Sequence, residues 1–311
     1  HARAQVQMLC DTACCEDSKI RVMPDVHAGK VGPVGLTMTV KGKIMPAIVS
    51  GDIGCGVTIT EITNLKYFQQ QDGQKLDKVI RERIPTGSAN RTEPHPKAEE
   101  IDLSELRCAD HIQMDRAYLG LGSLGGGNHF IEVERKARDY FAGPVFDVYI
   151  CDEEFLSEEQ MNAIRAQQDR CIPGDDFLVI HSGSRNLGQQ VCDYYMKAGQ
   201  KYLREKGIEV PYEMTWLEGE LAADYLHDVQ IVCRYAELNR RIMQMEIFKG
   251  MKWKAGESFS SVHNYIGEDG ILRKGAVSAK AGDQIIIPAN MAEGCFLGIG
   301  KGNPDWNMSA P

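Results

Sequence analysis

Short β-rich runs alternate with longer helical segments along the chain. The runs at 19–22, 35–40 and 57–62 are rich in Val, Ile, Thr and Met, and each is bounded by Gly or Pro, as strands usually are. Similar hydrophobic runs follow at 145–150 and 177–180. We therefore predict strands at these five places.

Helical periodicity appears between and after these runs. The segment 219–249 has apolar residues at three- and four-residue spacing, which predicts the longest helix and a stripe that packs in the core. Ser104 is expected to cap a helix running to about 118, and the sequence SEEQ at 157–160 is typical of a capping box. Residues 1–5 also read as the interior of a helix. The periodic positions of the longest helix are Leu221, Tyr225, Val229, Val232 and Ala236.

Length and composition narrow the class of protein. A chain of 311 residues with 43% hydrophobic and 25% charged residues can form one large core or two smaller ones. The sequence has no run of 18 apolar residues, which argues against a membrane span. Without a secretion signal, the ten cysteines are predicted to be reduced thiols of a cytoplasmic protein. The net charge of −9 disfavours non-specific coating of nucleic acid but does not exclude a local basic groove.

Candidate chemistry gathers where glycines stand beside histidines. Asp52 and Cys55 lie three residues apart in the turn DIGCG. Each such residue alone has a structural explanation, as a core histidine, a buried thiol or a turn former. Together they are the ligand types of a transition-metal site, and a thiolate with imidazoles indicates zinc first. The four histidines in glycine- or asparagine-rich turns are His27, His129, His181 and His263.

Six motifs, taken in order, resemble those of the RtcB family of RNA-splicing ligases. They read PDVHAG at 24–29, DIGCG at 52–56, GNHFIE at 127–132, HSGSR at 181–185, HNY at 263–265 and RKGAVSA at 273–279. The resemblance runs from about residue 20 to the C-terminal end. It implies an α+β fold, with a mixed β-sheet core and surrounding helices around a two-metal pocket, in a single catalytic domain that spans residues 1–311.

The resemblance also implies the reaction, cofactors and partners. An RNA 3′-phosphate or 2′,3′-cyclic phosphate end is joined to a 5′-hydroxyl end, in RNA repair or tRNA splicing. GTP first guanylylates a histidine, the guanylate passes to the RNA 3′-phosphate, and the 5′-hydroxyl displaces GMP. RNA with broken ends is the implied substrate, and an archease-type activator is a further expected partner.

In the same resemblance, two Mn²⁺ ions share Cys55 as a bridging thiolate. Asp52 and His129 complete one metal site, and His181 and His263 complete the other. Arg185 offers a planar fork to a phosphate or an RNA end, with a surface salt bridge as its alternative role.

Nucleotide contacts are implied for residues of the GNHFIE and HNY motifs and of the segment 288–295. Because side chains alternate across a strand, His129 and Glu132 can face one pocket only if the strand begins after His129 or is irregular. Asp25 and His27 are expected to orient metal ligands rather than bind metal. The implied nucleotide-binding set is Asn128, His129, Phe130, Ile131, Glu132, His263, Asn264, Pro288, Ala289, Asn290, Met291 and Cys295.

Two departures from the family pattern are visible. The sequence PANMA at 288–292 stands where most members resemble Gly-Ser-Met-Gly, and Cys295 replaces a residue that is often serine, so we expect a divergent subfamily. The sequence NPDWNMSAP at 303–311 resembles the approach to a His-Gly-Ala-Gly-Arg motif whose His is the nucleophile, and none of the eight histidines present fits that role. We therefore expect the extreme N-terminus and a C-terminal part to be missing and the chain alone to be inactive. A metal-dependent phosphoesterase and a non-catalytic GTP- or RNA-end-binding fragment stay open as alternatives.

Overall fold

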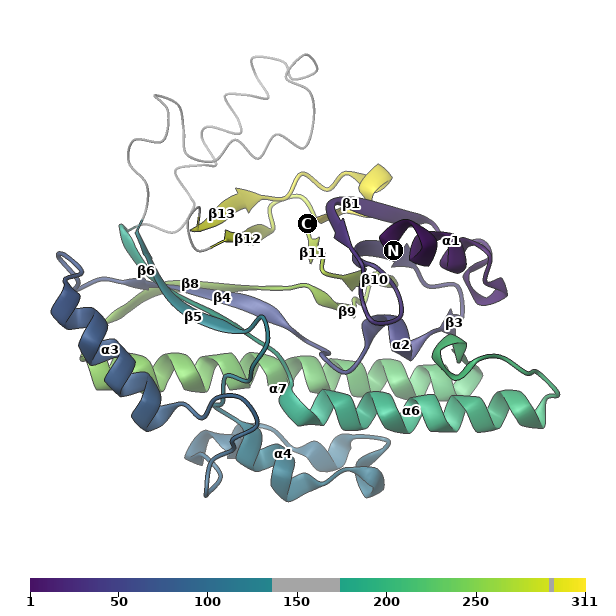
Figure 1. The fold of residues 1–311 in the computed structure, drawn as a ribbon, viewed down its shortest axis with the longest axis horizontal. Helices are drawn as coiled ribbons and strands as arrows, with labels where there is room; N and C mark the ends of the chain where they lie inside the picture. Colours follow the sequence, from purple (N-terminus) through teal and green to yellow (C-terminus); the bar gives the residue numbers. More distant parts are fainter. Residues whose placement is uncertain (136–173, 291–293) are drawn as a thin grey trace, which may run out of the picture.

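The computed structural model describes residues 1–135, 174–290 and 294–311 (Figure 1). Its helices are α1 (Ala2–Cys10), α2 (Pro46–Val49), α3 (Gln70–Arg83), α4 (Met114–Gly120), α6 (Arg185–Glu205) and α7 (Gly219–Met251). Its strands are β1 (Ile20–His27), β2 (Val34–Thr39), β3 (Lys43–Ile44), β4 (Gly56–Ile62), β5 (Phe130–Arg135), β6 (Asp176–Ser182), β7 (Leu217–Glu218), β8 (Ala255–Val262), β9 (Asn264–Ile266), β10 (Ile271–Lys274), β11 (Val277–Ser278), β12 (Gln284–Asn290), β13 (Gly294–Ile299) and β14 (Ser309–Ala310).

A four-stranded sheet in the order β5-β6-β4-β8 forms the centre of the fold. The α+β class is confirmed. Where the resemblance implied a mixed sheet, every strand ladder in the described part is antiparallel, and the parallel pairing found there is an isolated bridge between Thr86 and Gly125. The antiparallel order has a consequence for the site: it places the first residues of β4 and β5 beside the last residues of β6 and β8.

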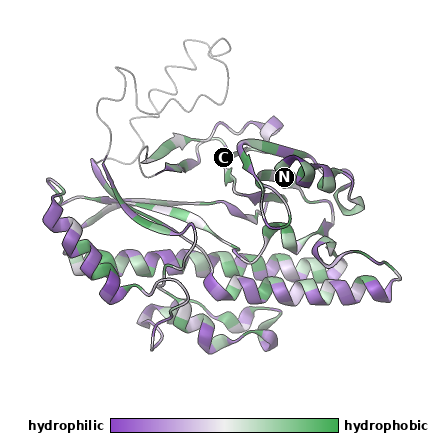
Figure 2. Ribbon diagram, viewed as in Figure 1, coloured by the Kyte–Doolittle hydropathy of each residue, from purple (hydrophilic) through white to green (hydrophobic). Residues whose placement is uncertain are grey.

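The central sheet is covered on both faces, as Figure 1 shows. Along β6, Leu178 and Ile180 pack against α3 and α7, whereas Phe177 and Val179 pack with Ile286 of the β12–β13 hairpin. This alternation follows from the two-residue period of a strand. Figure 2 shows hydrophobic residues along these strands and hydrophilic residues along the outer sides of α3 and α6.

A second sheet in the order β1-β2-β10-β9 carries the C-terminal segment. The Arg273 guanidinium of β10 is buried, donates to both carboxylate oxygens of Asp269, and donates through Nε to Ser309 Oγ at 2.9 Å. Strand β14 then pairs with β11, with Val277 opposite Ala310. The end of the described chain is therefore held next to the strand that follows the RKGA motif.

The predicted long helix is confirmed, because α7 runs from Gly219 to Met251 and buries Tyr225, Val229 and Val232 in the core. The predicted helix at 104–118 is wrong. That segment forms two 3-10 turns, Leu103–Glu105 and Ala109–His111, before α4 begins at Met114. The buried carboxylate of Asp228 accepts the backbone N–H groups of Arg107 and Cys108, at 2.7 and 3.1 Å, and the Cys108 N–H is the donor that a helix capped by Ser104 would need for its first intrahelical bond.

The predicted strands at 19–22, 35–40, 57–62 and 177–180 correspond to β1, β2, β4 and β6, and the helical reading of residues 1–5 corresponds to α1. The predicted strand at 145–150 and the capping box at 157–160 lie outside the described residues. Among the residues that the structure describes, no helix combines the length and apolar character that a membrane crossing requires.

Candidate metal centre

One end of the central sheet gathers the metal-ligand types that the sequence singled out. Cys55 immediately precedes β4, His129 immediately precedes β5, His181 lies one residue before the end of β6, and His263 immediately follows β8. The ladders place Val57 of β4 opposite His181 and Phe130 of β5 opposite the same residue. Four neighbouring strands therefore each supply one side chain to the same place.

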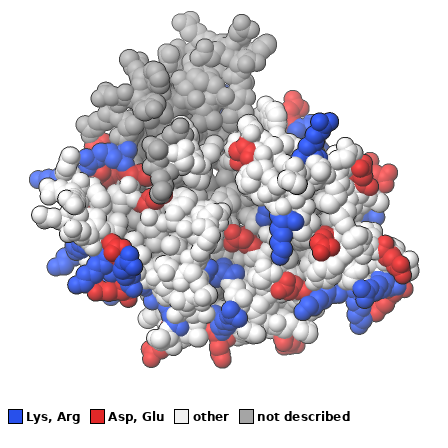
Figure 3. All heavy atoms as spheres, viewed as in Figure 1, with Lys and Arg blue, Asp and Glu red and all other residues white. Residues whose placement is uncertain are grey.

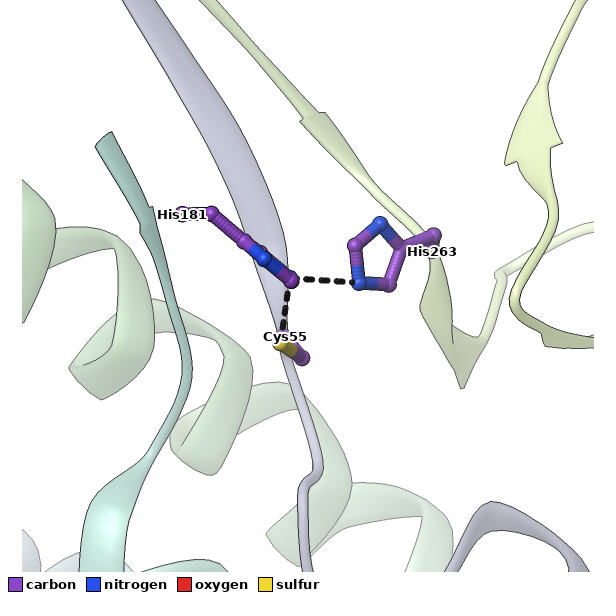
Figure 4. Close-up of side chains that lie close together, drawn as sticks. All are labelled: Cys55, His181 and His263. Carbon is purple, nitrogen blue, oxygen red and sulfur yellow. Dashed lines mark hydrogen bonds between the residues drawn. The ribbon is translucent and has the colours of Figure 1, made fainter. Parts of the chain in front are cut away.

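The side chains form two three-residue groups that share one thiol. Cys55, His181 and His263 make the first group, and Asp52, Cys55 and His129 make the second, with the ligand atoms of each group within 4.8 Å of one another. The first group is drawn in Figure 4, where dashed lines join the His181 ring to both Cys55 and His263. The shared Cys55 is the residue that the resemblance implied as the bridging ligand.

Measured contacts define each group. Cys55 Sγ lies 3.2 Å from His181 Nε2, which in turn lies 3.2 Å from His263 Nε2. In the second group, Cys55 Sγ lies 3.5 Å from His129 Nε2, and that nitrogen lies 3.4 Å from Asp52 Oδ2.

Backbone carbonyls orient two of the imidazole rings. His129 Nδ1 donates to Leu124 O at 2.9 Å, and His181 Nδ1 donates to Asn128 O at 2.9 Å. A proton held on Nδ1 leaves the Nε2 lone pair free for a ligand, which is the arrangement usual for histidines that bind metals. Both Nε2 atoms face Cys55, so the donors converge as a cation would require.

The protonation states suit metal binding at neutral pH. Burial, together with neighbouring cations, lowers the pKa of His181 to about 4 and that of His263 to about 3, so both rings are neutral. Burial acts to raise the pKa of Asp52, but the hydrogen bond and charge of His129 outweigh it and bring the pKa to about 2. Burial and the charge of Asp52 raise the pKa of the Cys55 thiol. If an ion binds here, Cys55 is the residue of the groups that would have to lose a proton.

Close backbone approach explains one of the glycines at this end of the sheet. A Cβ atom at Gly183 would lie 2.2 Å from Asp52 Oδ1 and 3.3 Å from Cys55 Cα. Only a residue without a side chain permits the turn after His181 to lie so near the DIGCG turn. The glycine in the HSGSR motif is thus required by the packing of the two ligand-bearing turns.

The donor set fits a divalent transition-metal ion. One carboxylate, one thiol and three imidazoles are available, and two imidazole nitrogens, those of His181 and His263, face each other across 3.2 Å. Without an ion, a neutral His263 that carries its proton on Nε2 can donate to His181 Nε2, and a cation could take the place of that shared proton and be bound by both nitrogens. Whether these five residues bind metal stays a prediction.

Comparison with known proteins identifies the family. A family model described as "tRNA-splicing ligase RtcB" matches residues 8–113 and 92–311. The chain belongs to the RtcB family. The resemblance seen in the sequence motifs is therefore confirmed.

Several RtcB proteins are similar over most of the chain. RNA-splicing ligase RtcB1 of Escherichia coli strain ATCC 25922 is 29% identical over 325 residues, covering 92% of this chain and 71% of the relative. RNA-splicing ligase RtcB2 of the same strain is 24% identical and covers 88% of this chain and 62% of the relative. The tRNA-splicing ligase RtcB of Methanococcus maripaludis is 25% identical, with 88% and 68% covered.

The RtcB-implied nucleotide residues on β5 divide between the two faces of the sheet. Strand β5 begins directly after His129, which is the condition under which His129 and Glu132 can share a pocket. Phe130 packs with the β12–β13 hairpin and lies edge-on to the His181 ring, at 5.1 Å between centroids. Glu132, two residues further, shares that face, and burial and Glu134 raise its pKa. Ile131 packs on the opposite face, toward α3 and α7, so only its backbone is available to the nucleotide side.

The other RtcB-implied nucleotide residues have different surroundings. Asn264 is buried and its amide donates to Asp52 O at 2.6 Å, so it fixes the DIGCG turn. Asn128 is exposed, and its carbonyl holds His181. Cys295 pairs with Pro288 and lies 3.0 Å from Glu134 Oε1, to which its thiol donates. Pro288, Ala289 and Asn290 end β12, and Met291 lies outside the described residues.

Arg185 and the PDVHAG motif have other partners in the described structure. Arg185 Nε donates to Ser123 Oγ at 3.0 Å and Nη2 donates to Gly87 O at 2.6 Å, and its expected binding of a phosphate or an RNA end stays a prediction. Asp25 and His27 are exposed on β1, and His27 Nδ1 donates to Asp25 O. Neither residue belongs to the two ligand groups found among the described residues.

Sequence reasoning missed two cations beside the ligands. Arg240 of α7 is buried and donates to Gly54 O and Ser182 O, at 2.9 and 2.8 Å. Lys274 donates to Val49 O and Ser50 Oγ, and burial lowers its pKa although Asp52 and Cys55 oppose the effect. The signal for Lys274 was present, since it stands in the RKGAVSA motif. Arg240 had only a weak signal, a polar residue within an otherwise apolar helix face.

Proposed function

We propose that the chain is the metal-binding catalytic part of an RNA ligase that uses GTP and Mn²⁺. It would join RNA 3′-phosphate or 2′,3′-cyclic phosphate ends to 5′-hydroxyl ends through a histidine–guanylate intermediate. Membership of the RtcB family and the names of its similar proteins, RNA-splicing and tRNA-splicing ligases, support the reaction class. The observation that carries the proposal is the pair of three-residue groups that share Cys55.

The proposed ligands divide as the groups do. Asp52, Cys55 and His129 would hold one ion, and Cys55, His181 and His263 the other. A pair of divalent ions polarises a phosphoryl group and stabilises charge on the attacking and leaving oxygens. The protein's own part is to present the neutral imidazoles of His181 and His263 and an ionised Asp52 at neutral pH, with the His129 and His181 rings oriented by backbone carbonyls.

The face of the central sheet next to the ligands suits a nucleotide. Phe130 and Glu132 lie on the face that the β12–β13 hairpin covers, and Phe130 touches the His181 ring. An aromatic ring offers a stacking surface, and a carboxylate accepts hydrogen bonds from a nucleobase or ribose. Guanylate contacts at Asn128 and Asn290 are part of the same proposal.

The register of the last strand supports the expected place of the nucleophile. Val277 pairs with Ala310 and Ser278 pairs with Ser309. A residue that continued this register after Pro311 would lie opposite Gly275, whose N–H donates to His263 O at 2.6 Å. The position at which the RtcB motif places its nucleophilic histidine would therefore lie beside a proposed metal ligand.

The charge pattern on the face drawn in Figure 3 supports recognition of an RNA end rather than general attraction to RNA. On the described part of the face in Figure 3, Lys and Arg are interspersed with Asp and Glu. Sequence-independent binding to a phosphate backbone needs clustered positive charge. The proposed selectivity therefore rests on the terminal phosphate at the metal centre.

A GTP-labelling experiment tests the proposal. The purified protein is incubated with GTP and Mn²⁺, denatured, and weighed by intact-mass spectrometry. Covalent GMP, with attachment to a histidine after Pro311, is the expected result. Cys55→Ala should abolish labelling, and Cys192→Ala, which removes a buried thiol outside both groups, should keep it.

The same preparation separates the alternative functions. Phosphate release from RNA 3′-phosphate ends without GTP, and without labelling, would favour a phosphoesterase. Binding of Mn²⁺ and GTP with neither labelling nor phosphate release, in a chain that carries the histidine, would favour a non-catalytic end-binding protein. Either result would refute the ligase proposal.

A further inference from the structure

A buried guanidinium lies directly behind the two ligand-bearing turns. Arg240 is 0% exposed in the middle of α7. Within the described residues, its hydrogen bonds go to neutral oxygens, Gly54 O, Ser182 O and Thr58 Oγ1, and no ion pair includes it. Burial of a cation without a carboxylate partner lowers the stability of the fold, which suggests that Arg240 has a function other than core packing.

The two carbonyls that Arg240 binds belong to the neighbours of two metal ligands. Gly54 directly precedes Cys55, and Ser182 directly follows His181. One nitrogen, Nη1, donates to both carbonyls, at 2.9 and 2.8 Å. Because the guanidinium is planar and rigid, it fixes the separation of the two turns from which the Cys55 thiol and the His181 ring extend.

The rest of the Arg240 side chain is also constrained. Nε donates to Thr58 Oγ1 at 3.0 Å, which anchors the guanidinium on β4. Nη2 is buried with no hydrogen-bond partner among the described residues. A buried donor without an acceptor is rare in native proteins, and a negative charge nearby compensates it best.

The preceding residue on the helix completes the arrangement. Asn239, also fully buried, accepts the N–H groups of Gly122 and Ser123 through Oδ1. Its Nδ2 donates to Ser182 Oγ and Gly183 O, at 3.2 and 3.1 Å. The loop that leads to His129 is thereby tied to the turn that follows His181. Two consecutive residues of α7 hold the loops of three proposed ligands.

We propose that Arg240 is a positioning residue of the metal centre, which sets the spacing of Cys55 and His181 before any ion binds. The inference rests on the proposed metal site and adds to it a residue that touches no ion. Loss of Arg240 would then lower the affinity for both ions together, because Cys55 belongs to both groups. A role limited to core packing would lower the stability of the fold and leave the affinity of the folded protein for metal unchanged.

Cobalt binding to the metal-free protein tests this inference. Co²⁺ is the probe because its bond to a thiolate gives a near-ultraviolet charge-transfer band that reports on the Cys55 geometry. Arg240→Lys keeps the charge but loses the fork, and Arg240→Met loses both. We expect each variant to bind Co²⁺ at least tenfold more weakly than the unaltered protein, with a weaker charge-transfer band per bound ion.

Two control variants match these substitutions. Arg241→Met removes the neighbouring, exposed arginine, which pairs with Glu100. Met243→Ala leaves a cavity in the same helix, in the cluster that packs against α3. Both should keep the Co²⁺ affinity within twofold, although Met243→Ala should lower the thermal midpoint of the metal-free protein.

The outcomes distinguish this inference from the function on which it rests. Wild-type affinity and spectrum in Arg240→Lys and Arg240→Met would overturn the positioning role. If Arg240→Met does not fold, Arg240→Lys decides, since it keeps the buried cation and most of the volume. Failure of the unaltered protein to bind Co²⁺ or Mn²⁺ would instead refute the proposed metal site.

Discussion

Cys55 Sγ lies 3.2 Å from His181 Nε2, although the two residues are 126 positions apart in the chain. The contact joins the start of β4 to the end of β6, and it places Cys55 in both ligand groups. A thiol shared in this way makes the two proposed metal positions depend on one residue.

Replacement of the shared thiol should therefore remove both ions. Cys55→Ala leaves each group with two ligands, and we expect bound manganese to fall from two ions per chain to fewer than 0.2 (roughly tenfold). Cys192→Ala, with a buried thiol outside the groups, should retain the unaltered content. Elemental analysis after dialysis makes the measurement, and undiminished manganese in Cys55→Ala would contradict the two-ion assignment.

Metal affinity should rise with pH because of the same thiol. His181, with a pKa of about 4, His263, at about 3, and Asp52, at about 2, are already in their binding forms above pH 6. The pKa of Cys55 is raised, so its proton leaves only when the ion binds. One released proton predicts an increase of about tenfold in affinity per pH unit from this residue. Calorimetry in buffers of different ionisation enthalpy counts the protons, and a Cys55 contribution of zero would argue against thiolate ligation.

A methyl group at Gly183 should damage the site more than the fold. Its Cβ would lie 2.2 Å from Asp52 Oδ1, so the Asp52 side chain must move out of its group. We expect Gly183→Ala to lower the affinity for the ion in the Asp52 group by about tenfold or more, consistent with loss of one charged ligand. Gly32→Ala is the control, because its nearest neighbour would be an ordinary 3.6 Å away. Equal metal affinity in the two variants would show that Asp52 is not a ligand.

Loss of the carboxylate that pairs with Arg273 should destabilise the fold. Asp269→Asn leaves a guanidinium that is 1% exposed without its ionic partner, which typically costs about 3 kcal/mol. Glu205→Gln removes an exposed partner of Lys201 and should cost less than about 0.5 kcal/mol. Urea unfolding at pH 7 compares the two variants, and equal midpoints would contradict the expectation.

Acid should remove the contribution of Asp269 to the free energy of unfolding. Burial acts to raise the pKa of Asp269, but the hydrogen bond and charge of Arg273 outweigh it, and the net pKa lies below the ordinary value of 3.8. A carboxylate with a lowered folded-state pKa stabilises the protein above its unfolded-state pKa, and that stability is lost as the pH falls through the folded-state value. The difference between the unaltered protein and Asp269→Asn should therefore shrink below about pH 4. A difference that grows on acidification would show the opposite linkage.

The elements that could be predicted from sequence are those with a strong local period. Tyr225 and Val229 of α7 repeat at four-residue spacing, and the core lies along that stripe. The prediction of a helix from Ser104 was wrong because of a contact with a residue far away in the sequence. Asp228, 120 positions beyond Cys108, takes the backbone donor that the helix would have used. No window of local sequence contains that competition.

Some residues of the candidate site could be predicted from the sequence and others could not. Glycine-flanked residues such as Cys55 and His181 could be found because glycine marks turns at strand ends, and the structure brings them together. Arg240 could not, because a polar residue within a helix usually faces solvent, and its burial depends on carbonyls of strands far away in the chain. The manganese ions and the nucleotide came from family resemblance alone, since spacing does not identify a metal.

The order β5-β6-β4 also determines when the site can first exist during synthesis. Asp52, Cys55 and His129 are all translated well before β6, yet β6 lies between the strands that carry Cys55 and His129. A nascent chain that ends before residue 182 therefore has three ligands of one group but no scaffold to bring them together. Ion uptake would be coupled to insertion of the middle strand, and the other ion must wait for His263. Occupancy of the first proposed site would then mark a chain in which β6 has joined β4 and β5, and occupancy of both sites would mark one that also contains β8.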